Sequence, residues 1–208
     1  MIDRQRMVGV ILAGGQSSRM GGRDKGRLEL GGKTLIGRVR DRLEPQCVSV
    51  VLNANGDPAR FAEFGMPVVP DSVPGFAGPL AGILAAMTWA SRQRPRTSHV
   101  LSVACDTPFF PRDLGKRLAQ ALAGSAAPIA IAASAGARHP VFGLWPVDLA
   151  GGLAAFLASG EGGKVMRFAE RHGVVEADFP FAGDADPFFN INTPEDFDIA
   201  RRRASQSG

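Results

Sequence analysis

Short, uninterrupted apolar runs alternate along this chain with amphipathic segments of helical period. Residues 8–13 form one such run and end in two glycines, and residues 99–104 form another that ends in Cys105 and Asp106. Strands buried on both faces of a parallel sheet show this continuous pattern, because none of their side chains faces water. Strands and helices that alternate at this spacing require βαβ crossovers. The sequence therefore predicts a doubly wound α/β fold, with a mostly parallel sheet flanked by helices.

The expected elements follow one another at short intervals. No internal repeat, linker or charged low-complexity run separates a second unit, so we expect one domain over residues 1–208, with a core at about 8–203 and short flexible termini. Strands are predicted at 8–13, 48–52, 67–70, 99–104, 129–133, 141–145, 174–179 and 188–191, and helices at 34–43, from 57, and at 79–89, 111–123, 147–157, 164–172 and 194–203.

Composition excludes several classes of protein. Apolar residues make up 45% of the chain and charged residues 21%, which excludes collagen, coiled coils and wholesale disorder. Tyrosine is absent and aromatic residues are only 7%, which argues against a protein that stacks single-stranded bases. The net charge of +4 suits an anionic small ligand as well as nucleic acid. The basic residues at 201–203 are interpreted as a solvated helix end, so no nucleic-acid partner is expected.

The sequence also predicts the compartment. No stretch reaches 18 apolar residues, so no membrane span is expected, and residues 1–15 lack the pattern of a signal peptide. Cys47 and Cys105 lie far apart and form no CxxC motif. A cytoplasmic protein without disulfides is the simplest interpretation.

A glycine-rich, cationic loop follows the first predicted strand and extends to about Gly32. Its paired glycines let backbone N–H groups approach a ligand, and between Gly14 and Lys33 five basic residues face two acidic ones. A polyphosphate is the expected ligand. The loop has no GxGxxG pattern, and the stretch 26–34 has one residue too many for a Walker A motif and does not directly follow a strand. A plain solvated loop would not explain such a long basic segment directly after a buried strand.

Two further positions carry oxygen donors. Asp106 follows a predicted buried strand, where a carboxylate can hold Mg²⁺ or begin an Asx-type turn, and the local pattern favours neither. Asn190 and Asn192 alternate on an extended segment, so their side chains point to the same side. They could contact a metal or a ring edge, or they could cap the helix that begins near Pro194.

These motifs resemble those of nucleotidyltransferases with a doubly wound, glycosyltransferase-A-like fold. The resemblance begins with Leu12-Ala-Gly-Gly15, Arg19-Met-Gly21 and Asp24-Lys-Gly26, and it is strongest to the molybdenum cofactor guanylyltransferases. Further motifs follow in order and extend it over about residues 8–200: Asn53-Ala-Asn55, Asp71, Gly78-Pro-Leu-Ala-Gly82, Cys105-Asp-Thr-Pro108 and Asn190-Ile-Asn-Thr-Pro-Glu195.

The resemblance implies a reaction and its participants. The enzyme would bind Mg²⁺ and GTP and transfer GMP to the terminal phosphate of molybdenum-molybdopterin, with release of pyrophosphate. The attacking phosphate is already anionic, so no general base is required, and catalysis consists of positioning and charge neutralisation. A monomer is expected, with molybdenum-cofactor delivery proteins or molybdoenzymes as the further partners that such a product allows.

The resemblance also assigns residues. Arg19, Lys25 and Asp106 would be catalytic, with Asp106 as the metal ligand, and Asp71 would pair with the guanine edge. Lys164 is assigned to the molybdopterin side with Asn190 and Asn192, although the segment around it is less basic than relatives often show. The residues expected to bind GTP are Leu12, Ala13, Gly14, Gly15, Arg19, Lys25, Asn53, Asp71, Gly78, Gly82 and Asp106.

Other interpretations stay open at this point. A cytidylyltransferase or a sugar-1-phosphate nucleotidyltransferase would use the same fold, and a cofactor chaperone would bind GTP without turning it over. Asn53 could be an ordinary loop residue, and the run from Gly78 to Gly82 could simply begin a helix. The three histidines show no metal-ligand spacing, and His139 is the one that could border a pterin cleft. Cys105 is expected to be a packed thiol.

Overall fold

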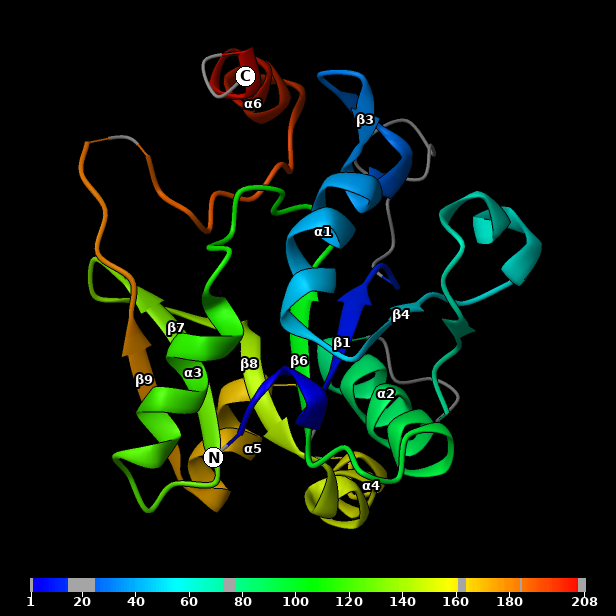
Figure 1. Ribbon diagram of the computed structural model, residues 1–208, viewed down its shortest axis with the longest axis vertical. Helices are drawn as coiled ribbons and strands as arrows, with labels where there is room; N and C mark the ends of the chain where they lie inside the picture. The colour runs from blue at the N-terminus through cyan, green and yellow to red at the C-terminus, as the bar shows by residue number, and fades with distance from the viewer. Residues whose placement is uncertain (1, 15–24, 73–77, 161–163, 184, 206–208) are drawn as a thin grey trace.

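The computed structural model describes residues 2–14, 25–72, 78–160, 164–183 and 185–205. Within these ranges a seven-stranded sheet has the strand order β5-β4-β1-β6-β8-β7-β9 (Figure 1). Its strands are β1 (Met7–Leu12), β4 (Ser49–Asn53), β5 (Val68–Val69), β6 (His99–Ala104), β7 (Ile129–Ser134), β8 (Ala137–Pro146) and β9 (Val174–Asp178). The α-helices are α1 (Leu35–Leu43), α2 (Pro79–Gln93), α3 (Leu114–Ala123), α4 (Ala150–Ala158), α5 (Val165–His172) and α6 (Pro194–Ser205).

The sheet is mostly parallel, as predicted. Strand β1 lies between β4 and β6 and pairs with both in parallel, and the pairs β4–β5 and β7–β9 are also parallel. Strand β8 is the exception, because it runs antiparallel to both β6 and β7. Strands β7 and β8 are joined by a tight turn at Ala135 and Gly136. Ala135 (φ 47°) and Gly136 (φ 78°) both adopt the left-handed conformation that tight hairpins require.

Helices cover both faces of the sheet. Residues of β1 alternate between the faces, with Ile11 in one core cluster and Val10 in the other. Helices α1 and α3 pack on the first face, which lies in front in Figure 1, and α2, α4 and α5 pack on the second. No described helix is long and apolar enough to cross a membrane.

A small third layer lies beyond the carboxyl ends of β1 and β6 (Figure 1). It consists of α6 and a hairpin of β2 (Glu29–Leu30) and β3 (Lys33–Thr34), whose turn residues Gly31 and Gly32 have φ of 57° and 75°. This hairpin was not predicted, because the residues up to Gly32 read as one continuous glycine-rich loop. The hairpin and α6 share an apolar cluster formed by Leu30, Leu35, Phe109, Ile191 and Ala200.

The structure corrects several predicted boundaries. Residues 188–191 are not a strand, because this stretch leaves the sheet and makes a single backbone hydrogen bond to Asp106 through the N–H of Ile191 (2.9 Å). Helix α3 begins at Leu114 rather than at 111, because the preceding residues form a turn that closes on the carbonyl of Pro111. Pro58–Phe64 is a 3₁₀ helix (η4), and the predicted helix 147–157 divides into the 3₁₀ helix η5 (Val147–Leu149) and α4.

Candidate active site

The carboxyl ends of three neighbouring strands bring the predicted site residues to one edge of the sheet. Leu12 at the end of β1 is in register with Asn53 of β4 and Ala104 of β6. The pairing continues past the strands, because the N–H of Ala13 donates to the carbonyl of Asn53 (2.9 Å) and that of Cys105 donates to Leu12 (3.2 Å). Asp106, which follows Cys105, therefore emerges at the same edge as Gly14, as predicted for a doubly wound fold.

Lys25 joins the far end of the glycine-rich loop to Asp106. Its Nζ lies 2.8 Å from Oδ2 of Asp106 and 2.9 Å from Oδ1 of Asn192. The side chains of Lys25 and Asp106 are only 16% and 24% exposed, so water screens their attraction less than at an open surface. Three segments distant in sequence thus meet at one ammonium group.

The segment 190–192 is tied to the residues after β6. The hydroxyl of Thr107 lies within hydrogen-bonding reach of Oδ1 of Asn190 and, at 3.3 Å, of Oδ1 of Asp106. Asn190 thus contacts Thr107, and Asn192 contacts Lys25, which is itself bonded to Asp106, so both amide oxygens lie near Asp106 as the alternation predicted. Thr107 is fully buried and was not among the predicted site residues. Its position between Asp106 and Pro108, in the motif Cys105-Asp-Thr-Pro108, was the one sequence feature that could have pointed to a role in the site.

Asp196 fixes the start of α6 next to this segment. Its Oδ2 accepts hydrogen bonds from the N–H groups of Asn192 and Thr193 (both 2.9 Å), and its own N–H donates to Oγ1 of Thr193 (3.1 Å). This reciprocal arrangement is a capping box. The backbone hydrogen bond from Asn192, together with those from Thr193 and the charge of Lys25, lowers the pKa of Asp196 despite some burial. Thr193 and Asp196 therefore cap α6, whereas the side-chain oxygens of Asn190 and Asn192 bond Thr107 and Lys25 instead.

A second polar group lies at the end of β4. The Nδ2 of Asn53 donates to Oδ1 of Asp71 (2.9 Å) and to the carbonyl of Val69 (3.1 Å), and Nδ2 of Asn55 donates to Oδ2 of Asp71 (2.7 Å). The N–H of Asp71 donates back to Oδ1 of Asn55 (2.9 Å). Two amides therefore hold the predicted base-binding carboxylate in one orientation. Asn55 ends the motif Asn53-Ala-Asn55, but the resemblance did not assign it to the site.

Gly82 has a packing role beneath Asn53. It is buried in α2, and a Cβ atom at this position would lie 2.2 Å from Oδ1 of Asn53 and 2.6 Å from Cδ2 of Leu12. Neither distance is tolerable, so the absence of a side chain lets the helix approach the strand ends. Gly78 is the exposed N-cap of α2, and Gly14 is exposed at the end of β1.

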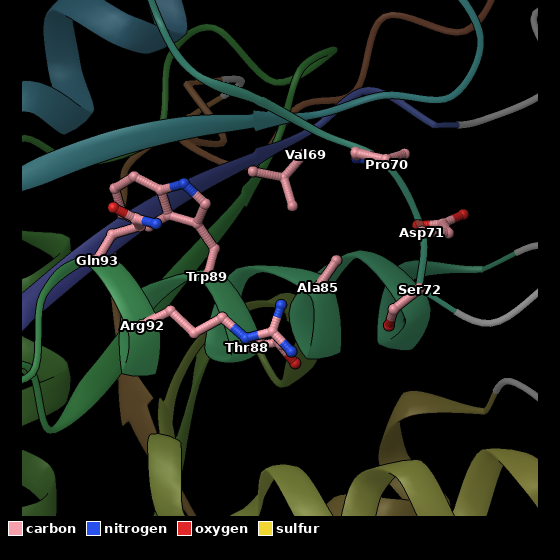
Figure 2. Close-up of a pocket in the computed structure, with 9 residues that line it drawn as sticks. All are labelled: Val69, Pro70, Asp71, Ser72, Ala85, Thr88, Trp89, Arg92 and Gln93. Atoms are coloured by element: carbon pink, nitrogen blue, oxygen red, sulfur yellow. The ribbon is translucent and has the colours of Figure 1, made fainter.

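A mainly apolar pocket of about 290 Å³ lies between the end of β5 and α2. Figure 2 shows Trp89 and Gln93 at one end of it and Asp71 and Ser72 at the other. An apolar surface therefore borders the carboxylate that Asn53 and Asn55 orient.

Several predicted residues do not join this group. Gly15 and Arg19 lie outside the described residues. Lys164 is the exposed N-cap of α5, and no hydrogen bond or ion pair among the described residues links it to Asp106. Helix α5 lies toward the opposite end of the molecule from α6 (Figure 1).

The donor set around Asp106 suits a hard cation that is only partly held by protein. The described residues contain no group of three or more His, Cys, Asp or Glu side chains placed to hold a metal. Asp106 offers a carboxylate, and Asn190 and Asn192 offer amide oxygens nearby. Mg²⁺ commonly takes one or two carboxylates and completes its shell with water and substrate phosphates, so these residues fit it.

The comparisons with known proteins agree with this geometry. A model of the MobA-like NTP transferase domain matches residues 9–175. The molybdenum cofactor guanylyltransferase of Bradyrhizobium sp. (strain ORS 278) is 52% identical over 95% of this chain and 92% of its own length. The crystal structure of molybdopterin-guanine dinucleotide biosynthesis protein A from Archaeoglobus fulgidus has a TM-score of 0.74 at 24% identity and covers 96% of this chain and 99% of its own. A manganese complex of Rv0371C from Mycobacterium tuberculosis H37Rv has a TM-score of 0.65 at 20% identity, covering 98% and 100% of the two chains.

Fold, motif order and domain model together define the class of protein, which is a nucleotidyltransferase of the MobA-like type. The sequence identity of about one half to curated relatives, over nearly the whole chain, identifies the family within this class. The chain belongs to the molybdenum cofactor guanylyltransferase family.

Proposed function

We propose that this protein transfers GMP from GTP to the terminal phosphate of molybdenum-molybdopterin, releasing pyrophosphate and forming the guanine dinucleotide form of the cofactor. The names of relatives at 49–52% identity support this reaction. The observation that carries the proposal is the meeting of Lys25, Asp106 and Asn192 at the carboxyl edge of the sheet. A cation and a carboxylate in contact can separate to bind an anionic phosphate and its counter-cation.

Asp106 would hold Mg²⁺ in this reaction, with Asn190 or Asn192 near its shell. When bound, the ion would neutralise phosphate charge as the bond to pyrophosphate breaks. The manganese complex of a structural neighbour supports the use of a divalent cation by this fold. The hard oxygen donors around Asp106 support the choice of Mg²⁺.

Lys25 would bind the phosphates of GTP. Its ammonium has three donors, and Asp106 and Asn192 accept two of them in the structure. Transfer of Lys25 from the carboxylate to a phosphate oxygen would leave Asp106 available to the cation. Arg19 and Gly15 are proposed to complete the phosphate site. No residue needs to remove a proton, because the attacking group is a phosphate anion.

Asp71 would select guanine. A carboxylate that accepts from N1–H and from the exocyclic amine of guanine finds no such donor pair on adenine or cytosine. Asn53 and Asn55 hold this carboxylate in place, so little ordering is left to occur on binding. Leu12, Ala13, Gly14, Gly78 and Gly82 form the surroundings in which the nucleotide is proposed to lie.

Molybdopterin would approach from the side of the segment 190–192. Asn190 and Asn192 lie beside Asp106, where the two substrates must meet. Lys164 is proposed only as a peripheral phosphate contact, since no described interaction links it to this group. We further propose that the protein acts as a cytoplasmic monomer that hands its product to delivery proteins or molybdoenzymes.

One experiment tests the reaction and separates it from its alternatives. Purified protein with Mg²⁺ and loaded molybdopterin is given GTP, CTP, UTP or ATP in parallel, and pyrophosphate release and the dinucleotide product are measured. Release with GTP alone supports the proposal. Turnover with CTP but not GTP would make the protein a cytidylyltransferase, and GTP binding without pyrophosphate release would make it a chaperone.

A further inference from the structure

A second cationic region lies outside the site around Asp106. It is a groove of about 1000 Å³ bordered by α1, the β2–β3 hairpin, α6 and the segment that follows Thr107. Its charged lining residues are Lys33, Arg38, Arg42, Arg112, Arg201 and Arg202, against Glu29, Asp41 and Asp198.

Most of the acidic charge in this groove is already paired. Asp41 Oδ2 lies 2.5 Å from Nζ of Lys33, and Asp198 lies 3.8 Å from Nη1 of Arg201. Among the described residues, Arg38, Arg42 and Arg112 form no ion pair. The groove therefore keeps an excess of positive charge that the part of the chain described by the structure does not neutralise.

Backbone carbonyls hold two of these guanidinium groups in place. Arg38 donates from Nε to the carbonyl of Leu30 (2.5 Å) and from Nη2 to that of Gly31 (3.2 Å). Arg42 donates from Nη1 to the carbonyl of Phe110 (2.9 Å). A carbonyl orients a guanidinium without cancelling its charge. Because each guanidinium has five N–H donors, several of them stay available to a ligand.

The cations lie close enough to repel one another. Arg42 is half-buried, and this burial, together with the charges of Arg112, Arg203 and Arg38, lowers its pKa. Arg203 stands at the edge of the same region, with its guanidinium 4.2 Å from the ring centroid of Phe109. Like charges held together in partial burial destabilise a fold, and a bound anion would relieve that repulsion.

We propose that this groove is a second anion site, which binds a di- or triphosphate group through Arg38, Arg42 and Arg112. Planar guanidinium groups recognise phosphate oxygens in pairs, and three of them, two on α1 and one on the segment that follows Thr107, suit a chain of phosphates better than a single one. The ligand is inorganic pyrophosphate or the phosphate tail of a free nucleotide. The site is separate from Lys25 and Asp106, and its existence does not depend on the proposed GMP transfer.

The test must first remove binding at the main site. The full chain carrying Lys25→Met is titrated with pyrophosphate and with GTP by calorimetry in the presence of EDTA. In this background, Arg112→Gln should weaken binding about tenfold or more, because it removes a charge-assisted contact. Arg112 is exposed and makes no described hydrogen bond, so the variant should fold normally. Tighter binding of pyrophosphate than of GTP assigns the site to the inorganic ion, and the reverse assigns it to a nucleotide.

Arg96→Gln is the matched control. Arg96 is an exposed arginine in the turn between α2 and β6 and is not part of the groove, so its loss changes the net charge equally. The affinity of the Arg96→Gln variant for pyrophosphate and for GTP should stay unchanged. The proposal is overturned if Arg112→Gln and Arg38→Gln bind as tightly as the parent, or if Arg96→Gln weakens binding as much as they do. GMP transfer by Arg112→Gln with Lys25 intact should keep its kcat, so the two proposals fail independently.

Discussion

The ammonium of Lys25 and the carboxylate of Asp106 lie 2.8 Å apart, although 81 positions separate them in sequence. Asn192, a further 86 positions along the chain, accepts from the same ammonium. Each partner sits at the end of a different element: Lys25 begins the 3₁₀ helix η2 (Lys25–Arg27), Asp106 follows β6, and Asn192 precedes α6. The site is therefore created by tertiary structure, and its parts can be tested singly.

Replacement of Lys25 should reduce activity far more than stability. Lys25→Ala removes a phosphate-binding cation, and loss of one such donor typically costs on the order of 10²–10³ in rate. A partly exposed ion pair contributes only on the order of 1 kcal/mol to stability, so the variant should stay folded. Steady-state pyrophosphate release and thermal unfolding measure the two effects. An inactive variant that is also unfolded would make Lys25 a structural residue.

Asp106→Ala should lose most activity at every Mg²⁺ concentration, because it removes the carboxylate that is proposed to hold the cation. Asp106→Asn is the conservative comparison, since it retains an oxygen donor without the charge. We expect it to recover a part of the activity at high Mg²⁺ concentration. Near-normal turnover by purified Asp106→Ala would argue strongly against a metal-binding role.

Asp71→Asn should lower kcat/KM for GTP about tenfold to a hundredfold, since a charge-assisted hydrogen bond to the base is lost. The new amide would also face the donor groups of Asn53 and Asn55. Turnover with CTP should change little, so the ratio of GTP to CTP turnover is the informative quantity. An equal loss with both nucleotides would place the role of Asp71 in folding rather than in base selection.

Gly82→Ala should destabilise the protein by about 1–3 kcal/mol, because its Cβ would overlap with Oδ1 of Asn53 and with Leu12. Displacement of Asn53 should also raise the KM for GTP. Gly151→Ala is the matched control in α4, where a Cβ would meet nothing within 4 Å, and it should stabilise the helix by up to about 1 kcal/mol. Denaturant unfolding compares the two. Equal stabilities would show that α2 can move away from β4 at little cost.

His99 should make stability fall as the solution becomes acidic. Burial lowers its pKa from 6.5 to about 4. The unfolded chain then binds a proton near pH 6.5 while the folded chain does not, so stability is constant above that pH and declines between about pH 6.5 and 4. His139 is shifted in the same direction by burial. His99→Gln should flatten the decline in denaturant midpoint measured from pH 7.5 to 4.5, and an unchanged slope would contradict the prediction.

The sequence was informative where a local pattern sets the structure. Continuous apolar runs predicted β1 and β6, and parallel pairing then required Asp106 to lie near the end of β1. The alternation of Asn190 and Asn192 correctly predicted that both side chains face one way. The strand predicted at 188–191 was wrong, because extended backbone alone does not reveal whether a partner strand is present.

Other features depend on contacts that no local pattern contains. The pairing of Lys25 with Asp106 requires the path of the whole chain. The role of Thr107 depends on a side chain 83 positions away, and that of Asn55 depends on Asp71. Gly82 was expected to contact GTP, whereas the structure shows that a side chain at this position would collide with Asn53. The contact of Gly82 with a nucleotide stays a prediction.

The two edge strands of the sheet also affect whether copies of this protein can associate through their sheets. Strand β5 has only two residues, Val68 and Val69, so that margin offers few backbone groups for another chain to add to. At the other margin, Glu176 of β9 is bound by Arg138, and a strand laid beside it would have to approach this charged pair. Short or charged margins of this kind discourage strand addition between molecules and the aggregates that grow from it.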